Sequence, residues 1–182
     1  LVAVIFIYSH LGTTDIKVLY QYSFSDYRQI FLWLAFFCSF AVKVPMMPVH
    51  IWLPEAHVEA PTAGSVLLAG VLLKLGTYGF LRFSIPLFPY ATQYFVPFVY
   101  TMSLIAIIYA SFTTIRQIDL KKIIAYSSVV HMNFALVGLF TINLQSLLGS
   151  VFLMLSHGIV SGGLFLGVGV LYDRYHTRVI KY

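Results

Sequence analysis

Two lysines, Lys43 and Lys74, lie inside apolar runs that are long enough to cross a lipid bilayer. A cation at the bilayer centre costs at least about 2.5 to 3.5 kcal/mol, so an intramembrane lysine predicts a functional site. A low dielectric favours the neutral amine and brings its proton exchange toward neutral pH. His131 and His157 lie in two further apolar runs, and histidine already exchanges protons near neutral pH. Together the four residues predict a proton relay.

These four residues share one depth in the elements that must position them. Lys43, Lys74, His131 and His157 each lie within about two residues, or about 3 Å, of the middle of a predicted span. Helices packed side by side would place them in one lateral row, joined by hydrogen bonds or by water in a polar cavity. The hydroxyl groups expected to hold such water are those of Ser127 and Ser128.

Each candidate also has a simpler explanation. A lysine can extend its ammonium group to the membrane interface, and this applies more to Lys43, whose helix is interrupted, than to Lys74, which leucines flank. His131 and His157 can instead be packing residues that bond to neighbouring backbone or hydroxyl groups. Their common depth with the lysines favours the relay.

Two prolines interrupt the first predicted span directly after Lys43. Pro45 and Pro48 lack a backbone donor and their rings clash with preceding carbonyl groups, so the helix is predicted to open around residues 41–50. Broken helices at membrane depth are typical of transport sites. We expect unpaired carbonyl groups there to bind water and to respond to the charge on Lys43.

The segment after the break carries imidazole and carboxylate groups at His50, Glu55, His57 and Glu59. A metal site is disfavoured because the spacing matches no helical two-histidine site and a proline interrupts the register. We expect His50, Glu55 and Glu59 to support the break or to form a capped loop at the membrane surface.

The elements that carry these residues are predicted to be membrane helices. Five stretches satisfy the length of about 20 mostly apolar residues that a span needs, and their apolar residues do not alternate as in barrel strands. A stub of a further span precedes them, so the chain is predicted to be a single membrane region of a larger subunit. Gly163 and Gly167 form a small-residue pair that permits close helix contact. The five predicted spans are residues 30–52, 63–83, 94–115, 123–143 and 147–171.

Composition excludes several classes of function. The chain is 60% hydrophobic and 9% charged, whereas a soluble domain carries roughly a quarter charged residues, so the protein is predicted to be integral to a lipid bilayer. The net charge of +5 is scattered, which disfavours nucleic acid as a partner. With Cys38 as its single cysteine, the chain cannot form an internal disulfide or a cysteine-ligated metal cluster. Any redox centre is predicted to belong to other chains.

Basic residues are unequally divided between the two sides of the predicted bundle. By the positive-inside rule, the richer side faces the matrix or cytoplasm. The side with fewer lysines and arginines has Lys17, Arg28 and Arg82. The side with more of them has Arg116, Lys121, Lys122, Arg174, Arg178 and Lys181.

Several segments carry a longer pattern, in residues 41–65, 68–76, 120–128, 131–134 and 155–158. This pattern resembles the subunit 4 family of proton-pumping NADH:ubiquinone oxidoreductase, respiratory complex I, over nearly the whole chain. Residues 55–62 are most similar to mitochondrial versions. The resemblance therefore implies a multi-pass protein of the mitochondrial inner membrane.

The resemblance also implies an all-α, antiporter-like fold of about fourteen helices with two inverted repeats, each with one broken helix. Lys43 would be the lysine of the broken helix, Lys74 the lysine of the next span, and His131 and His157 the histidines that link two half-channels. The subunit would be a non-redox part of the enzyme and would bind no cofactor or metal. Other subunits would bind NADH, FMN, iron–sulfur clusters and ubiquinone.

The family's glutamate of the fifth span and its charged residue of the twelfth span have no counterpart in these residues. Membrane-arm partners are therefore implied, including the chain or segment that supplies the missing spans. Two alternatives remain open: a subunit of a related cation/proton antiporter or membrane hydrogenase, and a scaffold fragment that conducts no protons.

Overall fold

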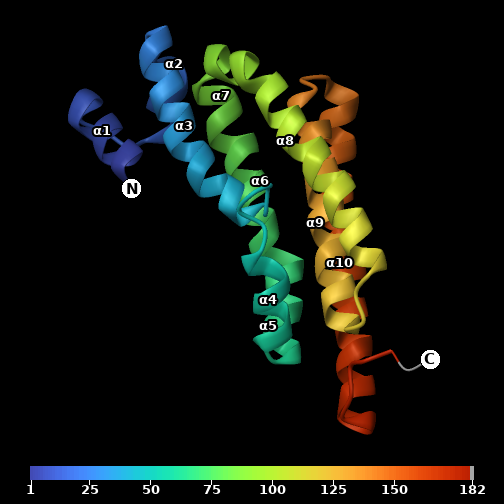
Figure 1. The fold of residues 1–182 in the computed structure, drawn as a ribbon. Helices are drawn as coiled ribbons and strands as arrows, with labels where there is room; N and C mark the ends of the chain where they lie inside the picture. Colours follow the sequence, from blue (N-terminus) through green and yellow to red (C-terminus); the bar gives the residue numbers. More distant parts are fainter. Residues whose placement is uncertain (181–182) are drawn as a thin grey trace.

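Helices make up nearly all regular structure in residues 1–180, the part of the chain that the computed structural model describes (Figure 1). Four of them are long and apolar enough to cross a membrane, and they follow one another in alternating directions. The prediction of an all-α membrane bundle with a broken helix is confirmed. The four helices are Thr62–Leu87, α8 (Pro89–Ile115), α9 (Leu120–Phe140) and α10 (Leu144–Tyr175).

The first predicted span, residues 30–52, is not one continuous helix. α3 (Asp26–Lys43) ends at the lysine itself, and α4 (Trp52–Glu59) begins after eight residues without α-helix. Two shorter helices precede α3 at the N-terminal end, α1 (Val2–Leu11) and α2 (Ile16–Gln21).

The helix from Thr62 to Leu87 changes its winding twice. π-helical turns precede and follow the segment that carries Lys74, and such turns occur often at functional sites. The consecutive pieces are α5 (Thr62–Leu67), η1 (Leu68–Leu72), α6 (Leu73–Gly79), η2 (Phe80–Ser84) and α7 (Ile85–Leu87).

Aromatic side chains pack α3 against α8 at the end of the bundle away from α4. Trp33 is fully buried and stacks between Phe37 and Phe95, with ring centroids 5.0 and 4.5 Å away. Its indole nitrogen donates a hydrogen bond to Thr92 Oγ1 at 3.1 Å. This end of the bundle therefore has a well-packed core, in which the stacked rings bury a large apolar area and the one polar atom of Trp33 has a hydrogen-bond partner.

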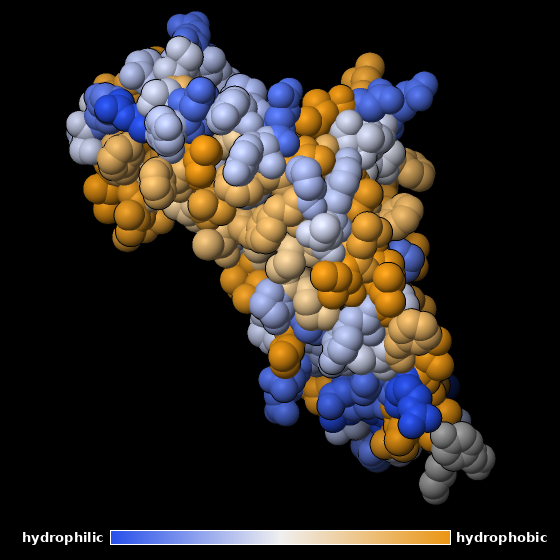
Figure 2. Space-filling view, turned by 45° about the horizontal axis from the view of Figure 1, so that its top comes forward, coloured by the Kyte–Doolittle hydropathy of each residue, from blue (hydrophilic) through white to orange (hydrophobic). Residues whose placement is uncertain are grey.

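Hydrophilic residues gather at the two ends of the visible face, and apolar residues cover the middle (Figure 2). The start of α9 and the end of α10 lie together at one end (Figure 1), with the basic residues Lys121, Lys122, Arg174 and Arg178. We call this the basic end. Lys181, which the orientation count includes, lies outside the described residues.

Close helix contact occurs at glycines other than the predicted pair. A Cβ at Gly163 or Gly167 would meet no atom within 4 Å in the described structure. At Gly76, in contrast, a Cβ would lie 3.1 Å from the Phe40 carbonyl oxygen and nearer still to the side chains of Lys43 and Val44. Gly76 therefore allows the end of α3 to lie directly on α6.

We predict that Gly76→Ala destabilises the protein by about 1 to 3 kcal/mol, because the added methyl group overpacks this contact. The thermal midpoint of the detergent-solubilised full-length protein should fall. Gly149→Ala is the matched control, because nothing lies within 4 Å of a Cβ there and alanine favours a helix over glycine. Equal midpoints for the two variants would contradict the prediction.

Candidate functional site

Lys74 and His157 meet inside the apolar middle of the bundle. The Lys74 ammonium lies 2.8 Å from His157 Nδ1 and donates a second hydrogen bond to the Ala69 carbonyl oxygen at 2.5 Å. Lys74 is half-buried and His157 is buried. A proton can pass directly between the amine and the imidazole at this distance.

The π-turn before Lys74 explains why the Ala69 carbonyl group is available. In an α-helix this carbonyl would accept from the backbone N–H of Leu73. Leu73 N–H bonds instead to Leu68 O, five residues back. The ammonium group of Lys74 therefore finds an acceptor on its own helix.

Glycine at position 158 allows α10 to approach closely enough for the Lys74–His157 contact. A Cβ on Gly158 would lie 3.1 Å from the Gly70 carbonyl oxygen and 3.7 Å from Lys74 Nζ. An open groove of about 360 Å³ between the two helices borders Lys74, Gly70 and Gly158. Most of its lining is apolar, so water in it would bond chiefly to the Lys74 ammonium group.

His131 is the third member of the cluster. Its ring centroid lies 5.8 Å from that of His157, with the planes inclined by 49°, so one water molecule can bridge the rings. His131 is exposed on α9. The structure thus brings together three of the four predicted relay residues, and we call Lys74, His157 and His131 the central cluster.

Lys43 does not bond to this cluster. As the last residue of α3, it places its Cβ against α6 at Gly76, which is half a turn from Lys74 and therefore on the opposite face of that helix. Its side chain is exposed. Within residues 1–180, no hydrogen bond or ion pair involves its ammonium group.

Two of the carbonyl groups at the break are bonded to side chains, which corrects the expectation of unpaired carbonyl groups at these two positions. Met46 N–H bonds to Ala41 O, five residues back, so that Val42 O accepts from the Trp52 indole at 3.0 Å. Pro45 O accepts from the Asn133 amide at 3.2 Å. The break therefore has a defined geometry.

The predicted supporting residues occupy different environments. His50 is buried, with its ring edge-on to Tyr109 at 5.7 Å, whereas Glu55 and Glu59 are exposed on α4. The hydroxyl groups of Ser127 and Ser128 both donate to the Ile124 carbonyl oxygen of their own helix, which leaves their lone pairs free to accept from water. Residues 1–180 contain no group of three histidine, cysteine, aspartate or glutamate side chains suited to a metal ion.

Asn133 is a site residue that the sequence analysis missed. It is fully buried, and its amide group donates both to Pro45 O and to Val129 O on its own helix. It connects the helix of His131 to the break that follows Lys43. A single asparagine two residues after His131, at the start of the apolar half of α9, offers only a weak signal for this contact.

These features define an integral membrane helix bundle with a broken helix and a lysine–histidine cluster at mid-depth. The family of NADH:quinone oxidoreductase and Mrp antiporter transmembrane proteins matches residues 1–182. The chain belongs to this family.

Similar proteins carry more specific names. The chain is 70% identical to NADH-ubiquinone oxidoreductase chain 4 of Marchantia polymorpha and 71% identical to that of Prototheca wickerhamii, in each case over all of its 182 residues. It spans 37% and 35% of the length of these two relatives. A chain of respiratory complex I from Thermus thermophilus, solved with bound NADH, matches with a TM-score of 0.91 and 30% identity, over 98% of this chain and 39% of that one.

We predict that Asn133→Leu loosens the broken helix, because the buried Pro45 carbonyl group loses its donor, at a cost of about 1 to 3 kcal/mol. Backbone amides in residues 44–51 should exchange with deuterium faster, as measured by mass spectrometry. Thr101→Val is the control, because that exposed hydroxyl bonds only within α8. Unchanged exchange in residues 44–51 of Asn133→Leu would show that this bond does not hold the break.

Proposed function

We propose that this chain forms part of a proton-translocating membrane subunit of NADH:ubiquinone oxidoreductase in the mitochondrial inner membrane. The observation that carries the proposal is the direct contact between Lys74 and His157 at mid-depth in a bundle of apolar helices. The relatives named NADH-ubiquinone oxidoreductase chain 4 support the assignment to this enzyme.

The central cluster moves protons laterally through the bundle. A proton on Lys74 Nζ passes to His157 Nδ1 along their hydrogen bond, and His157 releases a proton from its other ring nitrogen toward His131 through a bridging water. The Ala69 carbonyl group stabilises the charged form of Lys74 between transfers. No electron transfer occurs in these steps, so the chain takes a non-redox role.

Lys43 controls the charge of the cluster. Its helix end packs on α6 at Gly76, two residues after Lys74 and on the opposite face of the helix, so its charge acts on Lys74 across α6 and disfavours protonation of Lys74 without direct contact. An acidic partner from another part of the membrane arm attracts the Lys43 ammonium away from Lys74. Subunits elsewhere in the complex bind NADH, FMN, iron–sulfur clusters and ubiquinone, and quinone reduction drives the cycle.

A cation/proton antiporter is the second candidate, because the matching family covers Mrp antiporters as well. Genes encoding quinone-site and NADH-oxidising subunits next to this one would favour the oxidoreductase. A gene cluster of small antiporter chains without them would favour the antiporter.

We predict that Lys74→Met in the full-length subunit lowers the number of protons pumped per NADH oxidised by the assembled complex, because methionine cannot carry a proton. The measurement compares proton uptake with NADH consumption in inner-membrane vesicles. Lys17→Met, at the opposite end of the bundle from the basic end, should pump normally. Normal stoichiometry in Lys74→Met with normal assembly would favour a non-conducting scaffold.

A further inference from the structure

His57 is a buried histidine that the central cluster does not include. Its side chain is fully buried, and neither ring nitrogen has a hydrogen-bond partner among the described residues. One ring face stacks on Phe165 of α10, with centroids 4.3 Å apart. A buried donor or acceptor without a partner costs about 1 to 3 kcal/mol, so internal water is expected to bond to these nitrogens.

The backbone around His57 is held from three sides. Ser65 donates to the His57 carbonyl oxygen at 3.2 Å, Arg178 donates to Val58 O at 2.8 Å, and the Lys121 ammonium donates to Ala60 O at 2.9 Å. The backbone that carries His57 is therefore held by α5, α9 and the C-terminal segment, whose donors satisfy carbonyl groups at the end of α4.

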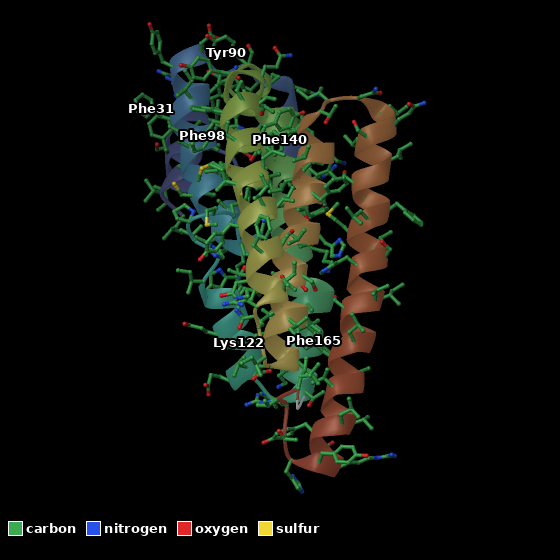
Figure 3. The ribbon with its side chains drawn as sticks, turned by 45° about the vertical axis from the view of Figure 1, so that its right-hand side comes forward. Phe31, Tyr90, Phe98, Lys122, Phe140 and Phe165 are labelled. Atoms are coloured by element: carbon green, nitrogen blue, oxygen red, sulfur yellow. The ribbon has the colours of Figure 1, made fainter. Side chains whose placement is uncertain are left out.

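His57 lies between the central cluster and the basic end. Its partner Phe165 follows His157 by eight residues on α10, about 12 Å along the helix, and lies in the half of the bundle that also holds Lys122 (Figure 3). Three buried hydroxyl groups occur in this region, those of Ser65, Ser128 and Ser161.

A polar cavity lies at the basic end against residues 58–62, which directly follow His57. It has a volume of about 480 Å³ and is bordered by Glu59, Lys121, Asp173 and Arg178. Lys121 belongs both to this cavity and to the surroundings of His57: burial and, to a smaller extent, the Lys121 charge lower the pKa of His57 to about 4, so its protonated form is short-lived. Water at the basic end can therefore come within a few residues of the imidazole.

We propose that His57 carries protons between the basic end of the bundle and the central cluster. The inference rests on the proposed function and adds to it the route by which the cluster exchanges protons with one side of the membrane. A proton delivered through water of the polar cavity binds the unprotonated ring nitrogen of His57, and the other nitrogen gives up its proton to water beside Ser161. A rotation of the imidazole then presents the unprotonated nitrogen to the polar cavity again, so that one proton enters and one leaves.

His57→Phe in the full-length subunit tests the route. Phenylalanine keeps the stack on Phe165 but removes both nitrogens, so protons pumped per NADH oxidised should fall as far as in Lys74→Met. His57→Gln is the second variant, because glutamine can still bond to water but carries no additional proton; the same loss is expected. If His57→Phe does not assemble, His57→Gln decides the question.

Ser103→Ala is the matched control. Ser103 is also fully buried with an unpartnered side-chain oxygen, but it lies on α8 outside the route, and its variant should pump normally. Normal pumping by His57→Gln would overturn the inference, because the imidazole would then only hold water. If Lys74→Met lowers the number of protons pumped per NADH oxidised and the His57 variants do not, the proposed role of the central cluster stands and only the route through His57 is overturned. A normal ratio in Lys74→Met would instead overturn the proposed function.

A structural readout is independent of activity. High-resolution density for the intact complex should contain ordered water within about 3.2 Å of a His57 ring nitrogen. A dry, close-packed surrounding on both nitrogens would overturn the route.

Discussion

The hydrogen bonds of the Lys74 ammonium group are the interaction on which the rest of this structure depends. An ammonium group at mid-depth costs several kcal/mol unless it has partners, and hydrogen bonds to charged groups contribute about 1.5 to 3 kcal/mol each. The Ala69 carbonyl group and the His157 imidazole supply two. The π-turn before Lys74 and the glycine at position 158 both serve these bonds.

In the broken helix, too, polar groups at membrane depth have hydrogen-bond partners within the protein. Pro45 and Pro48 interrupt the helical hydrogen bonds between α3 and α4, and side chains supply donors there: Trp52 to the Val42 carbonyl group and Asn133 to the Pro45 carbonyl group. Backbone groups inside a bilayer must be satisfied within the protein. The break is therefore a fixed feature of the fold, and its geometry depends on α9.

Much of this arrangement could be predicted from residue order. Continuous apolar runs predict helices because a span must bond its own backbone, and a common depth predicts that Lys74, His131 and His157 lie at one level. Depth does not give rotation about the helix axis. For this reason the exposure of Lys43 and the contact of Asn133 with Pro45 could not be read from the sequence. The same holds for the glycines of α10. Gly158 contacts the neighbouring helix, and a Cβ at Gly163 would meet no atom within 4 Å in the described structure, because the rotation of the helix decides which of its faces packs.

The π-turn in η1 has a consequence for how the chain tolerates change. A π-turn accommodates one residue more than an α-helical turn while the helix on either side keeps its register. Removing one apolar residue from Leu68–Leu72 would let this turn close as an α-helix, and the carbonyl group that now accepts from the Lys74 ammonium would bond to the backbone instead. The number of residues in this turn, more than their identity, therefore decides whether Lys74 has an acceptor on its own helix.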